Sequence, residues 1–156
     1  MTAASIPDLL LHSEEATIAL AQRVAPTLKP GDCLLLSGPV GAGKSAFARA
    51  LIRALCGDDT EVPSPTFTLV QTYDSPAGEI WHADLYRLSS PDEAVELGLE
   101  DAFTNAICLI EWPDRLGSLI PDGALHLHLR AGDGAHHMRI EDRDGAWINR
   151  LGAFHG

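Results

Sequence analysis

A glycine-rich run, flanked by a short apolar segment and a helical one, constrains this chain more than any other feature. Residues 38–45 read Gly-Pro-Val-Gly-Ala-Gly-Lys-Ser, which fits the pattern G-x-x-x-x-G-K-[ST] at every fixed position. The preceding Cys33–Leu36 run is typical of a buried strand, and 44–56 is predicted to be a helix with Gly57 as its C′ residue. This order places backbone N–H groups at the positive end of a helix, which predicts a phosphate-binding P-loop.

The P-loop pattern assigns roles to the positions of the run. The residues expected to bind phosphate oxygens are Val40, Gly41, Ala42, Gly43, Lys44 and Ser45. Lys44 is expected to be exposed at the loop, where its amine would reach the β- and γ-phosphates of a nucleotide, and the hydroxyl of Ser45 would bind Mg²⁺. The alternative is an ordinary glycine turn capped by a serine, and the complete pattern between a strand and a helix argues against it.

Acidic residues at the ends of two predicted strands give a second chemical signal. Glu111 directly follows the apolar run 106–110, which is the Walker B arrangement for holding Mg²⁺ and polarising the attacking water. Asp84 follows a second predicted strand in the same way, and its alternative role is that of a solvated turn residue. Arg87 would either stabilise a transferring phosphate or pair with a neighbouring acid, and the sequence leaves both open.

The segment Ser64–Thr68 contains a proline between hydroxyl side chains. Pro65 stiffens a loop whose hydroxyls would meet the γ-phosphate and Mg²⁺, as switch loops do. Taken alone this signal is weak, since Ser-Pro loops are common turns. The histidine pairs at 126 and 128 and at 136 and 137 are interpreted as an exposed strand face and a loop, because spacing places no third metal ligand beside them.

The remaining periodicity predicts a three-layer α/β fold of the P-loop NTPase type. Its sheet is mixed, with a parallel core and antiparallel flanking strands. The predicted elements are a helix over 14–28, antiparallel strands over 67–73 and 79–83, a helix over 90–98, strands over 106–110, 125–129 and 137–141, and a short closing helix near 147–154. In the 125–129 strand, leucines alternate with His126 and His128, which predicts one face open to water.

Length and composition limit the class of protein to which this chain can belong. The 156 residues fit a single domain over 1–156, and 46% hydrophobic with 21% charged residues indicates a globular chain. No apolar run approaches transmembrane length, and the N-terminus lacks a secretion-signal pattern. Cys33, Cys56 and Cys108 are predicted to be buried free thiols, so we expect a cytoplasmic protein. The net charge of −11 argues against direct binding of nucleic acid, which needs clustered Lys and Arg.

Taken in order, these segments resemble the TsaE (YjeE) family of small bacterial P-loop ATPases over nearly the whole chain. The segments that carry the resemblance are 13–17, 36–49, 64–70, 82–88 and 107–113. Ser45 stands where a threonine is more usual in the family, and Pro39 where an acidic residue is. Because serine keeps the hydroxyl, the expected binding of Mg²⁺ is unaffected.

The resemblance implies an ATPase that binds ATP and Mg²⁺, hydrolyses slowly alone and acts with the TsaB–TsaD complex. That complex forms threonylcarbamoyladenosine next to the anticodon of tRNAs reading codons that begin with A, so this chain would meet tRNA mainly indirectly. By the same resemblance, Ser45 and Glu111 hold the metal ion, and Lys44, Asp84 and Glu111 are catalytic. The positions expected around the nucleotide also include Glu14, Thr66 and Ala135, and Trp112 lies beside the metal-binding acid.

Two other classes of function stay open from the sequence. A small-molecule or nucleotide kinase uses the same P-loop, although the chain shows no obvious arginine-rich lid and only 11 Lys and Arg in total. A nucleotide-gated binding module that barely hydrolyses differs from an ATPase only by degree. A phosphoacceptor screen and a turnover assay with partners present would separate these functions.

Overall fold

The computed structural model describes residues 4–132 and 134–154, and in them seven strands form one sheet. The strand order is β1-β7-β6-β2-β5-β4-β3. The strands are β1 (Ala4–Leu11), β2 (Cys33–Ser37), β3 (Val70–Ser75), β4 (Gly78–Asp84), β5 (Ile107–Glu111), β6 (Leu125–Gly132) and β7 (Ala135–Asp142). In the centre, β2 pairs in parallel with β5 and β6, and β4 with β5, whereas β1, β7 and β3 pair antiparallel with their neighbours. The predicted mixed sheet with a parallel core is confirmed.

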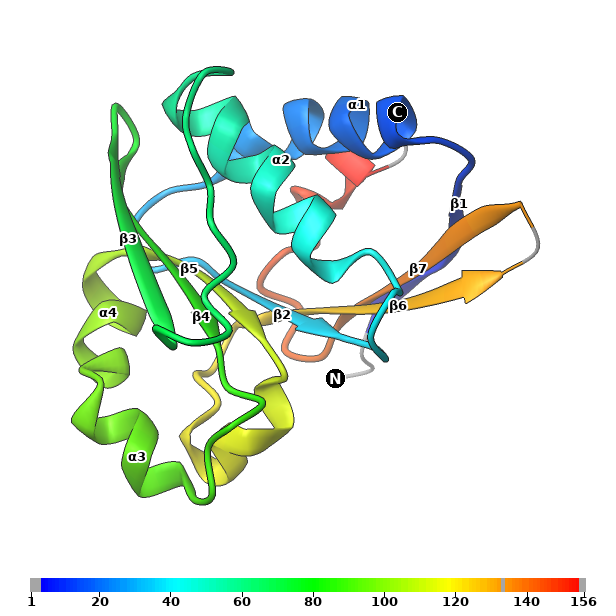
Figure 1. The fold of residues 1–156 in the computed structure, drawn as a ribbon. Helices are drawn as coiled ribbons and strands as arrows, with labels where there is room; N and C mark the ends of the chain where they lie inside the picture. Colours follow the sequence, from blue (N-terminus) through cyan, green and yellow to red (C-terminus); the bar gives the residue numbers. More distant parts are fainter. Residues whose placement is uncertain (1–3, 133, 155–156) are drawn as a thin grey trace.

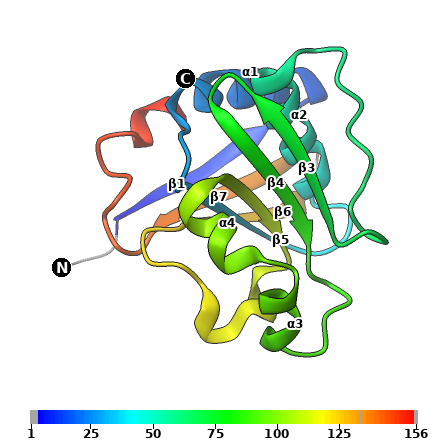
Figure 2. The ribbon, with the colours of Figure 1, turned by 90° about the vertical axis from the view of Figure 1, so that its left-hand side faces the viewer.

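Helices cover both faces of the sheet and complete the three predicted layers. They are α1 (Glu14–Val24), α2 (Lys44–Cys56), α3 (Pro91–Glu96) and α4 (Leu99–Asn105), with 3₁₀ turns η1 (Ala25–Thr27), η2 (Pro113–Leu119) and η3 (Leu151–Phe154). Helices α1 and α2 lie side by side over one face, while α3 and α4 lie on the opposite side (Figure 1; Figure 2 shows the same arrangement after a quarter turn). No helix in the described ranges is long and apolar enough to cross a membrane.

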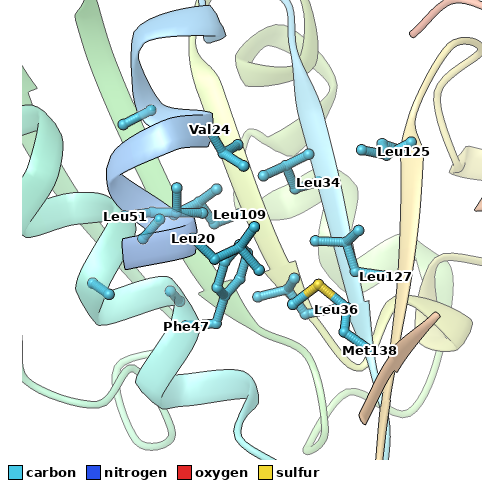
Figure 3. Packing of buried hydrophobic residues seen from close by; sticks show 14 of the residues in the cluster. Leu20, Val24, Leu34, Leu36, Phe47, Leu51, Leu109, Leu125, Leu127 and Met138 are labelled. Carbon is cyan, nitrogen blue, oxygen red and sulfur yellow. The ribbon is translucent and has the colours of Figure 1, made fainter. Parts of the chain in front are cut away.

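Strand β2 is buried on both faces, which is why its sequence is apolar without alternation. Leu34 and Leu36 pack with Phe47 of α2 in the larger hydrophobic cluster, as Figure 3 shows. Cys33 and Leu35 point the other way, into the cluster under α3 and α4. Because Phe47 is fully buried three residues after the start of α2, this packing holds the start of the helix against the end of the sheet.

Several predicted elements differ from the structure in their ends. Helix α2 begins and ends as predicted, and Gly57 follows it with a φ of 125°. The first helix ends at Val24 instead of continuing to 28, because Pro26 lacks the N–H that an α-helix needs and the chain turns into a 3₁₀ segment. Strand β3 begins at Val70, after a turn in which Leu69 has a φ of 70° and donates its N–H to Pro65. The sequence did not predict β1 or α4.

The predicted exposure of His126 and the predicted burial of Cys56 were wrong. His126 is 6% exposed instead of lying on a wet face, because its ring stacks at 6.2 Å on His128 and Glu141 lies opposite on β7. Burial lowers the pKa of His126. Among the cysteines, Cys33 and Cys108 are buried free thiols as predicted, and burial raises the pKa of Cys108 to about 12. Cys56 is only half-buried, at the end of α2.

Candidate functional site

The loop between β2 and α2 contains glycines that its neighbours require. Gly38 has a φ of 144°, and a Cβ there would lie 2.2 Å from the carbonyl oxygen of Leu129 on β6. Gly43 precedes α2 with a φ of 100°, and a Cβ there would lie 3.2 Å from Nδ1 of His136. Both positions combine left-handed backbone with close packing, so only glycine fits without strain. The loop therefore stays close to the sheet and delivers the chain directly into α2.

The first turn of α2 points its backbone N–H groups at this loop. These groups have no partners within the helix, and they carry the positive end of its dipole. The loop residues are not uniformly exposed: the Val40 side chain is 89% exposed, whereas the Ala42 side chain is buried and its N–H is donated to Pro39 at 3.1 Å. Gly41 has a φ of 86°, and a Cβ there would meet nothing within 4 Å, so the loop is open on that side.

A carboxylate from β5 lies against the start of α2. The Ser45 hydroxyl donates to Oε1 of Glu111 at 3.0 Å, although the two residues are 66 positions apart. Nε2 of His82 lies 2.7 Å from the other oxygen, Oε2. Glu111 is 2% exposed and pairs with Leu36 of β2 on one side and Asp84 of β4 on the other. The structure thus brings together the two residues expected from the sequence to share a metal ion.

Asp84 is a buried, hydrogen-bonded acid and not a solvated turn residue. It ends β4 directly beside Glu111 and is 7% exposed. Its Oδ2 accepts from the Thr66 hydroxyl at 3.2 Å, and its Oδ1 accepts from the N–H of Tyr86 at 3.0 Å. Thr66 also shares a hydrogen bond of 2.7 Å with Ser64. The loop 64–68 therefore docks on the same strand end that carries Asp84.

The Lys44 side chain is buried at 5% exposure, which contradicts our expectation from the sequence that it would be exposed at the loop. Its Nζ donates to the carbonyl oxygen of Gly38 and lies 3.7 Å from the ring centroid of Trp112. The Trp112 ring in turn lies 4.8 Å from that of Tyr86. Burial lowers the pKa of Lys44, while the nearby carboxylates of Glu111, Asp84 and Asp114 act to raise it. The ammonium thus lies over the Trp112 ring, with carboxylates nearby.

Two expected residues lie away from this cluster, in a cavity of about 820 Å³. Glu14 at the start of α1 and Ala135 at the start of β7 line it together with Arg49 and Arg53 of α2. His136, which packs against Gly43, lines it as well, so the cavity adjoins the loop. These residues come from α1, α2 and β7, which no local pattern in the sequence connects.

Three contacts of this site were not predicted from the sequence. His82 was not singled out, although it lies two positions before Asp84 in a strand, and period-two geometry puts both side chains on one face. Trp112 was placed beside the acid, but its contact with Lys44 depends on its backbone, whose φ is 59°. Arg87 lies over the Phe67 ring at 5.6 Å, a contact that neither of its two expected roles includes.

The sequence model of the family described as "Threonylcarbamoyl adenosine biosynthesis protein TsaE" matches residues 11–140. The chain belongs to the TsaE family. Among curated members, the tRNA threonylcarbamoyladenosine biosynthesis protein TsaE of Rickettsia bellii is 45% identical over 80% of this chain and 86% of its own length. The TsaE protein of Bacillus subtilis is 38% identical over 76% of this chain and 75% of its own.

A solved structure supports the same fold. The crystal structure of Bacillus subtilis YdiB superposes with a TM-score of 0.77, covering 100% of this chain and 99% of that one. At 24% identity this similarity concerns the fold. Residues 13–17, which carry part of the resemblance to TsaE, lie within the matched range together with the glycine loop and Glu111.

The hydroxyl of Thr66 is expected to keep the 64–68 loop docked on Asp84. Thr66→Val removes the hydroxyl but keeps the shape, so the loop loses one hydrogen bond to a charged group, worth about 1.5–3 kcal/mol. We expect faster amide exchange over 64–69, measured by mass spectrometry. Thr68→Val is the matched control, because the Thr68 hydroxyl accepts only from Gln71 among the interactions seen in the described residues. Equal exchange in the two variants would show that Thr66 does not hold the loop.

Proposed function

We propose that this protein is a Mg²⁺-dependent ATPase that is slow alone and stimulated by the TsaB–TsaD complex. Membership of the TsaE family places it in threonylcarbamoyladenosine biosynthesis. The ATPase activity and the partners are proposals, and one observation carries the ATPase activity. The Ser45 hydroxyl and the Glu111 carboxylate meet at 3.0 Å where a glycine loop enters a helix, beside a buried lysine.

The residues present fit a magnesium nucleotide. Mg²⁺ prefers oxygen ligands and is usually held by one or two carboxylates together with substrate phosphates, and Ser45 and Glu111 supply such oxygens. The buried ammonium of Lys44 has one carbonyl oxygen and an aromatic face as its observed partners, which suits an incoming anion. When bound, the metal ion would neutralise charge on the phosphate oxygens.

The chain's own groups would then act as follows. Backbone N–H groups of 40–45 would bind phosphate oxygens. The Lys44 ammonium would leave the Gly38 carbonyl oxygen and the Trp112 ring and bind the β- and γ-phosphates. Glu111 would hold the metal ion from the side of the sheet. Asp84 carries a carboxylate on the neighbouring strand end, where it would accept a hydrogen bond from the attacking water and orient it. Because the 64–68 loop contacts Asp84 through Thr66, its conformation would respond to the groups bound beside Asp84.

The nucleoside would occupy the cavity that Glu14 and Ala135 line. The cavity adjoins Gly43 through His136, so a nucleotide whose phosphates lie on the loop has room for ribose and base over α2. Its volume of about 820 Å³ falls in the range of small-molecule sites.

Partner stimulation is supported by the apolar side chains exposed around the site. Phe67 is 82% exposed, Tyr86 52% and Val40 89%. Large apolar groups left in water at a site are typical of protein–protein contact. With a net charge of −11, contact with tRNA would come mainly through the protein partners. The cytoplasmic location stays a prediction.

Removing the Glu111 carboxylate should damage hydrolysis more than nucleotide binding. In Glu111→Ala the loop N–H groups and Lys44 remain, but the metal ion and water lose their anchor. We expect turnover to fall on the order of 10²-fold or more, with ATP affinity far less affected. Glu111→Gln keeps the size and removes the charge, and should lose turnover as well. Unchanged turnover of both variants at saturating Mg²⁺ would refute the metal-binding role.

Asp84→Asn should lose much of the partner-stimulated ATPase activity. The amide keeps an oxygen for Thr66 but lacks the charge that orients water, while nucleotide affinity stays within about tenfold, roughly 1.4 kcal/mol. The measurement compares basal and stimulated rates with a binding titration alongside. Asp101→Asn, at an exposed position on α4, is the matched control. Full stimulation of Asp84→Asn would leave its carboxylate without a role in the reaction.

A further inference from the structure

His82 is a buried histidine whose one observed hydrogen bond reaches the site. It is 1% exposed on β4, and its Nε2 lies 2.7 Å from Oε2 of Glu111. The other ring nitrogen, Nδ1, is buried without a hydrogen-bond partner among the described residues. Buried polar atoms are normally paired, and leaving one unpaired costs about 1–3 kcal/mol. A leucine would fill this place without that cost. We therefore attribute the presence of a histidine at this position to its contact with Glu111.

The sheet register explains how His82 reaches the carboxylate. His82 pairs with Leu109 and Asp84 with Glu111, so His82 and Glu111 are diagonal neighbours on the same face of adjacent strands. Ile80, two residues earlier on that face, belongs to the hydrophobic cluster beneath α2. The ring therefore bridges the apolar core and the polar strand end. Since a carboxylate only accepts, Nε2 carries the hydrogen and donates it to Oε2.

Glu111 thus receives a donor on each oxygen, from two different elements. Ser45 of α2 donates to Oε1 and His82 of β4 donates to Oε2. Two such contacts on opposite oxygens fix the rotation of the carboxylate. If the Ser45 hydroxyl turned toward a bound metal ion, its hydrogen bond to Oε1 would be lost and the one from His82 would remain.

We propose that His82 is a positioning residue, which orients the Glu111 carboxylate so that Oε1 stays directed at Ser45 and the metal ion they share. This inference rests on the proposed function, because it requires Mg²⁺ at Ser45 and Glu111. Hydrogen-bond partners of metal ligands orient those ligands in many sites, and their removal typically lowers metal affinity or activity 10- to 100-fold. His82 itself does not touch the metal ion or the nucleotide.

The test replaces His82 in ways that separate its hydrogen bond from its volume. His82→Leu fills the space without a donor, His82→Asn carries a donor too short to reach Oε2, and His82→Gln places an amide nitrogen near the position of Nε2. His126→Leu is the matched control, since His126 is also a buried strand histidine but lies on β6. Thermal unfolding confirms that each variant is folded, and if His82→Leu does not fold, His82→Asn takes its place.

The primary readout is the Mg²⁺ concentration that half-saturates the increase in ATP affinity, measured by calorimetry, with ATP affinity in EDTA measured separately. We expect His82→Leu and His82→Asn to raise this concentration about 10- to 100-fold without changing the affinity in EDTA. His82→Gln should recover most of the loss, and His126→Leu should match the wild type. The turnover number is expected to follow the Mg²⁺ requirement.

Two results would overturn the role of His82 while leaving the proposed function standing. One is an unchanged Mg²⁺ requirement in His82→Leu. The other is a loss in His82→Gln as large as in His82→Leu, which would show that the packing of the imidazole matters and its hydrogen bond does not. If the wild-type protein itself binds ATP with no dependence on Mg²⁺, the proposed function fails and the role of His82 fails with it.

Discussion

The buried carboxylate of Glu111 is the interaction on which the rest of the site depends. A carboxylate at 2% exposure is costly unless its oxygens are hydrogen-bonded, and here the donors come from α2 and β4. Satisfying this one group therefore sets the distance between the helix that follows the glycine loop and the strand that ends in Asp84. Each of these elements is also held by apolar packing, so the polar contacts select among arrangements that the core already permits.

The same region places opposite charges on buried side chains. Lys44, Glu111 and Asp84 are all buried, and the partners of the Lys44 ammonium are a carbonyl oxygen and the Trp112 ring. An ammonium ion in such a place interacts more strongly with an anion than one in solvent does, because the local dielectric constant is lower. The buried lysine and the buried acids thus stabilise one another electrostatically.

Much of the fold could be predicted from the sequence because the informative patterns are local. The order of strand, glycine loop and helix predicted β2, the loop and α2, and strand-end position predicted that Glu111 would lie near Ser45. Features that depend on contacts between distant segments were missed or wrong. The burial of Lys44 depends on Trp112, and the burial of His126 depends on the residues of β7. The contact of His82 with Glu111 needs the register of β4 against β5, which no spacing within one strand reveals.

The most direct test of whether this loop binds a nucleotide is a titration with ATP. It compares the wild-type protein with Lys44→Ala, each with and without Mg²⁺. Unfolding of both proteins should be recorded as well, since truncating a buried side chain also affects packing. We expect Mg²⁺-dependent binding by the wild-type protein. In the variant, loss of a hydrogen bond from a charged group, about 1.5–3 kcal/mol, should weaken binding roughly 10- to 100-fold. Equal affinity in a folded Lys44→Ala variant would contradict phosphate binding by Lys44 and the function built on it.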